Sequence, residues 1–215
     1  GIYSTGSITI TNSTVSGNSA SYGGGLYSTG PSSEAFVMNS TISGNSASDQ
    51  GGGIHASGTL NVTNSTITGN GVSGLPGRGG GVYGSGVVTI SSSIISSNTA
   101  NGYGGGIHGS GTLSIINSTI AGNTASQPLG GGGGIYLSSG SLIVGNSTVA
   151  GNLATGWGGG LYATGGTILL TNSIIAVNAA PGEPDIRGTL AAGSGCNLIG
   201  IDPGFVRNPT PGGTD

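Results

Sequence analysis

GGGIHASGTLNVTNSTITGN, residues 51–70, is the stretch that decides the fold, because close copies of it recur along the chain. Residues 104–123 repeat it as GGGIHGSGTLSIINSTIAGN. The last glycine of each block falls at residues 1, 25, 53, 81, 106, 134 and 160, in steps of 24–28 residues. A repeat of this length without helical patterning indicates a solenoid, in which each unit packs against its neighbours.

Two asparagines keep a constant spacing in each repeat. The first opens Asn-Ser-Thr or a close variant, with Ser92 in its place in the fourth copy, and the second follows six residues later. Length varies after the second asparagine, as in residues 71–78, and after the glycine block, as in residues 28–34. Because loops absorb insertions and packed strands do not, we expect strands in the constant blocks and turns in the variable ones.

Four positions per repeat are aliphatic in all seven copies, and in the third copy they are Ile54, Leu60, Val62 and Ile67. Alternation of apolar and polar residues predicts half-buried strands. We therefore predict an all-β fold, a right-handed parallel β-helix. It would be a three-sided β-solenoid of about seven coils, each of roughly 24–29 residues. Successive coils would lie about 4.8 Å apart around an aliphatic core.

The repeats and the tail differ in composition. Residues 1–180 are assigned to the β-helix repeat domain, and residues 181–215 to a C-terminal cap or tail that is richer in proline and charge. The first coil shows no capping sequence before it. We therefore expect it to dock on the last coil or tail of another copy, a contact that propagates into a filament. The alternative is that the chain belongs to a longer solenoid.

The two asparagine columns are candidate structural ladders, in which each side chain bonds the backbone and the asparagine of the next coil. The first column comprises Asn12, Asn39, Asn64, Asn117, Asn146 and Asn172, and the second Asn18, Asn45, Asn70, Asn98, Asn123, Asn152 and Asn178.

An aromatic column follows the aliphatic residue after each glycine block, and alternation points it outward. It comprises Tyr3, Tyr27, His55, Tyr83, His108, Tyr136 and Tyr162. The coil between the two histidines carries Tyr83 at this position, so the histidines lie two coils, or roughly 9–10 Å, apart. That distance is too long for both to bind one zinc ion. We interpret the column as a stack that staples the coils. The alternative is a surface strip that binds sugar rings or a neighbouring protein.

A hydroxyl-rich column follows the first asparagine by two residues. It holds Thr14, Thr41, Thr66, Thr119 and Thr148, with isoleucine in the other two copies. This uncharged face resembles the Thr-x-Thr faces of ice-binding solenoids. Threonine is also a common exposed strand residue because its branched side chain packs well on a pleated surface. A plain structural column therefore remains the other interpretation.

The combination of Gly-Gly-Gly-[Ile/Leu/Val] with [Ile/Val]-x-x-Asn resembles the GGA[I/L/V] and FxxN repeats of bacterial polymorphic outer-membrane proteins. It is also similar to the parallel β-helix repeats of large secreted bacterial surface proteins. Pro184-Asp185-Ile186 and Asp202-Pro203 are similar to the segment that follows those repeats. The resemblance implies an extracellular or cell-surface location and an adhesin-like role.

Charge is sparse. The chain has three arginines, six acidic residues and no lysine, so it has no basic stripe that would indicate a nucleic-acid partner. No apolar run is long enough to span a membrane. Cys196 is the single cysteine, so it can form no internal disulfide.

The sequence offers few residues for catalysis. Glu34, Asp49 and Arg78 fall in different variable turns, whereas glycoside hydrolysis needs two paired carboxylates. Asp185 and Asp202 fit turn capping better than a Ca²⁺ site. We therefore expect no catalytic residue, metal site or cofactor.

The expected function is a non-enzymatic structural β-solenoid, whose partners are other copies of itself, surface proteins or glycans. Two alternatives stay open. One is a carbohydrate-active or carbohydrate-binding β-helix similar to polysaccharide lyases, and the other is an ice-binding solenoid.

Overall fold

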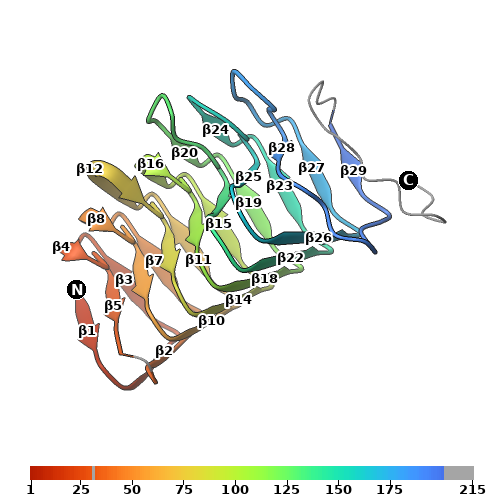
Figure 1. Cartoon of the computed structure of the whole chain (residues 1–215). Helices are drawn as coiled ribbons and strands as arrows, with labels where there is room; N and C mark the ends of the chain where they lie inside the picture. Colours follow the sequence, from red (N-terminus) through yellow and green to blue (C-terminus); the bar gives the residue numbers. More distant parts are fainter. Residues whose placement is uncertain (31, 201–215) are drawn as a thin grey trace.

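The computed structural model describes residues 1–30 and 32–200, which fold into a stack of parallel β-coils (Figure 1). Four sheets, A to D, run along the stack, and their strands pair with like strands of adjacent coils. The described residues contain no α-helix. The predicted parallel β-solenoid is therefore confirmed, and residues 201–215 of the predicted tail lie outside the described part.

The strands of each sheet follow one another in chain order. Sheet A contains β1 (Ile2–Ser4), β5 (Leu26–Ser28), β9 (Ile54–Ala56), β13 (Val82–Gly84), β17 (Ile107–Gly109), β21 (Ile135–Leu137), β25 (Leu161–Ala163) and β28 (Ile186–Arg187). Sheet B contains β2 (Ser7–Thr11), β6 (Glu34–Met38), β10 (Thr59–Thr63), β14 (Val87–Ser91), β18 (Thr112–Ile116), β22 (Ser141–Gly145) and β26 (Thr167–Thr171). Sheet C contains β3 (Thr14–Ser16), β7 (Thr41–Ser43), β11 (Thr66–Thr68), β15 (Ile94–Ser96), β19 (Thr119–Ala121), β23 (Thr148–Ala150), β27 (Ile174–Ala176) and β29 (Leu198–Ile199). Sheet D contains β4 (Ser19–Tyr22), β8 (Ser46–Gln50), β12 (Gly71–Arg78), β16 (Thr99–Tyr103), β20 (Thr124–Ala125) and β24 (Leu153–Ala154).

The solenoid has a fourth sheet, sheet D, whereas we predicted three sides and assigned the residues of sheet D to turns. Its strands vary in length, from the eight residues of β12 to the two of β20, which hides them in a search for constant blocks. Their inward position is nevertheless regular, because a small apolar residue lies two positions after the second asparagine. Ala47, Ala100 and Ala125 are examples, and all three are buried.

The core is the predicted aliphatic column set. Ile54, Leu60, Val62 and Ile67 have no exposed surface, and their counterparts in neighbouring coils pack against them in one cluster. Each buried aliphatic side chain contributes roughly 1.5–3 kcal/mol. Four such residues per coil are the main stabilising interaction of the solenoid.

The glycine blocks leave room for the asparagine side chains. A β-carbon on Gly53 would lie 3.0 Å from Asn70 Nδ2 and 2.7 Å from the carbonyl oxygen of Gly81. Gly51, at the start of the same block, has a φ of +64°, which favours glycine because it lacks a Cβ. The glycine block is therefore a tight corner, with its last residue fixed by contact with the asparagine of the same coil.

The second asparagine column is the ladder that the sequence predicts. The backbone N–H and the side-chain Nδ2 of Asn45 both donate to Oδ1 of Asn70, at 2.9 and 3.0 Å. Asn45 Nδ2 also donates to the backbone carbonyl of Val15 in the preceding coil, at 2.9 Å. The pattern repeats in each coil, so the ladder satisfies backbone groups at a corner that the sheets leave unpaired.

The first asparagine column is not such a ladder, and the prediction for it was wrong. Asn12, Asn39, Asn64, Asn117, Asn146 and Asn172 are exposed and have φ values of +48° to +51°. Asparagine tolerates this left-handed conformation, so these residues turn the chain between sheets B and C. The ladder at this corner is formed by the next residue: the N–H of Ser40 donates to Ser65 Oγ at 3.0 Å, and the N–H of Ser65 to Ser93 Oγ at 3.1 Å.

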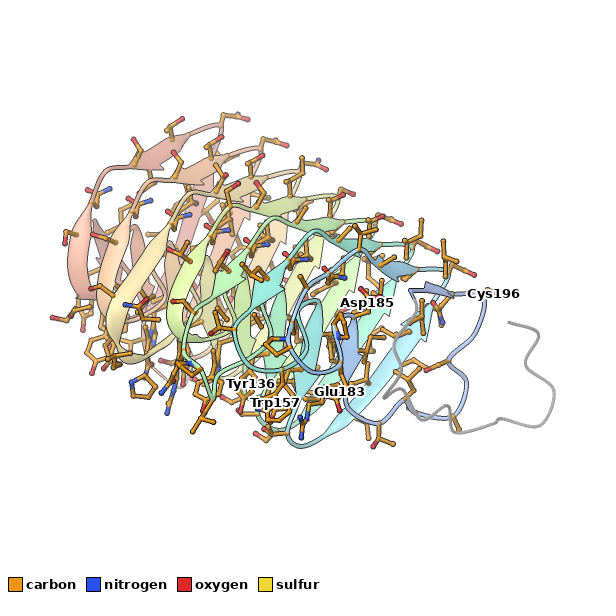
Figure 2. The ribbon with its side chains drawn as sticks, turned by 90° about the horizontal axis from the view of Figure 1, so that it is seen from above. Tyr136, Trp157, Glu183, Asp185 and Cys196 are labelled. Atoms are coloured by element: carbon orange, nitrogen blue, oxygen red, sulfur yellow. The ribbon has the colours of Figure 1, made fainter. Side chains whose placement is uncertain are left out.

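Residues after 180 add an eighth coil to the seven expected. Strand β28 pairs with β25 and β29 with β27, so the segment continues two of the sheets. Ile186 is buried in the core cluster, in the column of the aliphatic residues. Cys196 is exposed in this coil, with its sulfur unbonded to another cysteine. The described part of the tail is therefore stacked on the repeats, where Figure 2 shows Asp185 and Cys196.

Both ladders end on residues of this last coil. The N–H and Nδ2 of Asn178 donate to Oδ1 of Asp185, at 3.0 and 2.8 Å, and Asp185 is 3% exposed. The N–H of Ser173 donates to Oδ1 of Asn197 at 3.0 Å. Asp185 occupies the position of the last glycine in its coil, since its carbonyl accepts from the N–H of Leu161 at 2.9 Å. Its side chain fills the space that an asparagine fills elsewhere.

Replacing Asp185 tests this terminus of the ladder. Asp185→Ala leaves the buried N–H of Asn178 without an acceptor and removes one of the acceptors of its Nδ2, so we expect a loss of about 1–3 kcal/mol in stability. Asp185→Asn is the matched control, because it keeps an oxygen at the same position and should lose less. Thermal unfolding followed by far-UV circular dichroism measures both. An alanine variant that unfolds at the parent temperature would show that Asp185 does not stabilise the ladder.

Candidate functional site: an aromatic groove along sheet A

The predicted aromatic column exists and lies on the outer face of sheet A. Its members occupy one register from coil to coil, with Tyr27 paired to His55 and Tyr83 to His108. Arg187 continues the column beyond Tyr162. We call the column from Tyr3 to Tyr162 the aromatic strip.

The central rings of the strip stack on one another. The rings of His55 and Tyr83 are 4.7 Å apart and those of Tyr83 and His108 are 5.1 Å apart, at interplanar angles of 27° and 22°. Each of these rings therefore covers a face of its neighbour. The predicted staple between coils is confirmed for this part of the strip, and a sugar ring has no free central face on which to stack.

Burial keeps both histidines neutral. Desolvation lowers the pKa of His55 from its ordinary value of 6.5 to about 4, and that of His108 to about 3. The cation of Arg78 lowers the pKa of His108 further, whereas Asp49 partly opposes the shift at His55. The ring of Tyr83 lies between the two histidines, as predicted. Among the described residues no group of three or more His, Cys, Asp and Glu side chains is placed to hold a metal ion.

A second column runs beside the strip, and the sequence analysis missed it. It lies at the ends of the sheet D strands and consists of the residue before each glycine block, followed by Gly182 in the last coil: Tyr22, Gln50, Arg78, Tyr103, Gly131, Trp157 and Gly182. We call it the edge column. Large side chains immediately before Gly-Gly are the signal that would have revealed it.

The two columns touch along the solenoid. The ring centroids of Tyr22 and Tyr27 are 5.7 Å apart, and those of Tyr103 and Tyr136 are 4.7 Å apart. The guanidinium carbon of Arg187 lies 4.0 Å from the ring centroid of Trp157, a cation–π contact. Figure 2 shows Tyr136, Trp157 and Glu183 on the same side of the rod. Together the columns form an aromatic groove.

The groove contains a polar cavity of about 290 Å³. Its lining consists of Arg78, His108, Ser110, Ser138 and the rings of Tyr83, Tyr103 and Tyr136. A second hollow of about 300 Å³ lies further along the groove, beside Trp157 and between Pro128 and Pro181.

The charged residues considered for catalysis are divided between sheets. Glu34 begins β6 in sheet B, whereas Asp49 and Arg78 lie in sheet D. The carboxylate of Asp49 raises the pKa of the Tyr22 phenol, through hydrogen bonding and through its negative charge. The structure therefore brings Asp49 and Arg78 to the groove and leaves Glu34 on another side.

The predicted threonine column lies on the outer face of sheet C. Thr14, Thr41 and Thr66 occupy one register, which continues through Ile94 and Ile174. Both isoleucines are more than 40% exposed, at 47% and 43%, so the column faces outward. Hydrophobic side chains therefore interrupt the hydroxyl face at two coils.

Within the described residues no helix is long and apolar enough to cross a membrane. The family described as "Right handed beta helix region" matches residues 1–141 and, in a second alignment, residues 61–201. No curated protein and no solved structure matches the chain. Matched over most of its length and built as a parallel β-solenoid, the chain belongs to the right-handed β-helix family.

Proposed function

We propose that this protein is a non-enzymatic, extracellular or cell-surface β-solenoid, a stiff rod that displays its aromatic groove to partners. The observation that supports the proposal is that the polar and aromatic contacts of the protein run parallel to the long axis of the solenoid. The asparagine ladder, the serine ladder and the aromatic stack each run from coil to coil along the rod. Interactions repeated in this way stiffen a solenoid, whereas a catalytic site concentrates different groups at one point.

The groups that have acid–base chemistry to offer are largely engaged in structure. Asp185 accepts two hydrogen bonds at the end of the asparagine ladder. Glu183 pairs with Arg187 at 3.2 Å. His55 and His108 are stacked and neutral. These contacts support a structural role for each of them.

A surface location is supported by composition and by the resemblance of the repeats to bacterial surface proteins. The family itself supports the fold alone, because one fold hosts many functions. Head-to-tail assembly and binding to surface proteins or glycans are the two ways in which such a rod would act. Both remain predictions.

A screen for polysaccharide cleavage tests the non-enzymatic role. We expect no turnover of pectin, alginate or neutral glycans, with or without Ca²⁺, because Glu34 and Asp49 lie in different sheets. Released reducing ends and unsaturated products are the measurements. Cleavage that disappears in Glu34→Gln or Asp49→Asn would contradict the proposal and favour a carbohydrate-active enzyme.

The pH dependence of stability tests the aromatic stack. The pKa values of His55 and His108 in the folded state lie below 6.5, so the unfolded chain binds more protons between pH 6.5 and about 3. Their contribution to stability is complete above pH 6.5 and is lost as the pH falls toward those values.

The matched variant carries His55→Tyr and His108→Tyr, since tyrosine occupies the other coils of the strip. We expect a smaller fall in Tm between pH 7 and pH 4 than in the parent. An identical fall in both proteins would show that the histidines do not cause the acid sensitivity.

Ice binding is tested at sheet C. We expect no thermal hysteresis and no shaping of ice crystals at micromolar protein, because Ile94 and Ile174 interrupt the threonine column. Hysteresis that is abolished by Thr66→Lys would favour the ice-binding alternative over a structural face.

A further inference from the structure

The 290 Å³ cavity in the aromatic groove differs from the ladders and the aromatic stack, which recur in successive coils. The set of residues that lines the cavity occurs at one place along the rod. Arg78 and Tyr103 belong to the edge column, and Tyr83, His108 and Tyr136 belong to the aromatic strip. In the edge column, Gln50 precedes Arg78 and Gly131 follows Tyr103. The combination of a cation, a histidine and several hydroxyls is therefore not a consequence of the repeat.

Arg78 supplies a positive charge that no other described residue pairs with. Of the two arginines in the described part of the chain, Arg187 pairs with Glu183, whereas no carboxylate lies within ion-pair distance of Arg78. Asp49, on the neighbouring strand of sheet D, lies toward Tyr22 and His55, and it acts to raise the pKa of each. A guanidinium is always charged and offers a planar set of donors that matches a carboxylate.

The rest of the lining is polar and uncharged. His108 is 4% exposed, and its Nδ1 is buried without a hydrogen-bond partner in the structure. Ser138 Oγ donates to the carbonyl of Gly109 at 3.3 Å and keeps its own acceptor capacity. Ser110 adds a second hydroxyl to the same wall. The two serine hydroxyls are groups that exchange hydrogen bonds with hydroxyls of a ligand.

Size and charge together define the ligand. About 290 Å³ lies at the small end of ligand cavities, roughly 300–1,000 Å³, and accommodates one compact molecule or one sugar ring. One cation among neutral donors and acceptors balances a single negative charge. The serine hydroxyls in the lining suit a compact ligand that itself carries hydroxyl groups.

We infer that this cavity binds a small hydroxylated carboxylate, such as a sugar acid, with Arg78 as the carboxylate-binding residue. The ligand is either a free sugar acid or an acidic sugar at the end of a glycan. The inference goes beyond the proposed structural role and does not depend on it, because a rod and an enzyme are both able to hold such a ligand.

Titration of the purified chain with D-glucuronate, followed by calorimetry and by ligand-observed NMR, tests the inference. D-glucose is the neutral counterpart, since it differs at the carboxylate carbon. We expect one site for glucuronate and at least tenfold weaker binding of glucose and of acetate. Methyl glucuronide separates the two sources: binding as tight as that of glucuronate supports a glycan terminus, and much weaker binding supports a free acid.

Three variants locate the site. Arg78→Gln should weaken glucuronate binding at least tenfold while leaving Tm near that of the parent, because the guanidinium makes no ion pair within the described chain. Ser110→Leu should block the cavity by volume. Arg187→Gln, at the far end of the groove, is the matched control and should bind as the parent does. Undetectable glucuronate binding, equal binding of glucose, or unchanged affinity in Arg78→Gln would each overturn the inference.

Discussion

The structure depends on hydrogen bonds that pass from one coil to the next, because a single coil has no pairing partner for most of its backbone. Sheets A to D satisfy the straight segments, and the two ladders satisfy the corners. At a ladder position the side-chain oxygen accepts from the N–H of the coil before, and the backbone N–H donates to the side-chain oxygen of the coil after. This requirement explains why asparagine and serine persist at the same corners while the exposed residues around them change.

The sequence allowed the core and one ladder to be predicted, because both depend on side chains at a constant spacing. Ile67 and its counterparts, and Asn70 and its counterparts, are found by counting residues. The first asparagine column has an equally constant spacing, yet Asn64 serves through its φ of +48° rather than through its amide. Side-chain periodicity does not distinguish these two uses of asparagine, whereas backbone conformation does.

The candidate site was predicted in part, for a similar reason. The aromatic strip lies within constant blocks, so its order along sheet A followed from the repeat. The edge column ends segments of varying length, and its alignment depends on how β12 bulges to bring Arg78 opposite Gln50 and Tyr103. The cavity between the columns therefore required the structure, since one of its walls comes from residues that no fixed spacing aligns.

The asparagine ladder also has a direction. Each side chain donates through Nδ2 toward the C-terminal coil and accepts through Oδ1 from the N-terminal one, so all its amide dipoles point the same way. Its positive end meets the carboxyl group of Asp185, and its other end presents the carbonyl oxygen of Asn18. A coil added before Asn18 would arrive as a donor and fit this pattern. At the other end, the N–H and Nδ2 of Asn178 already donate to Asp185. The ladder is therefore a row of aligned amide dipoles whose positive end is neutralised by the carboxylate of Asp185.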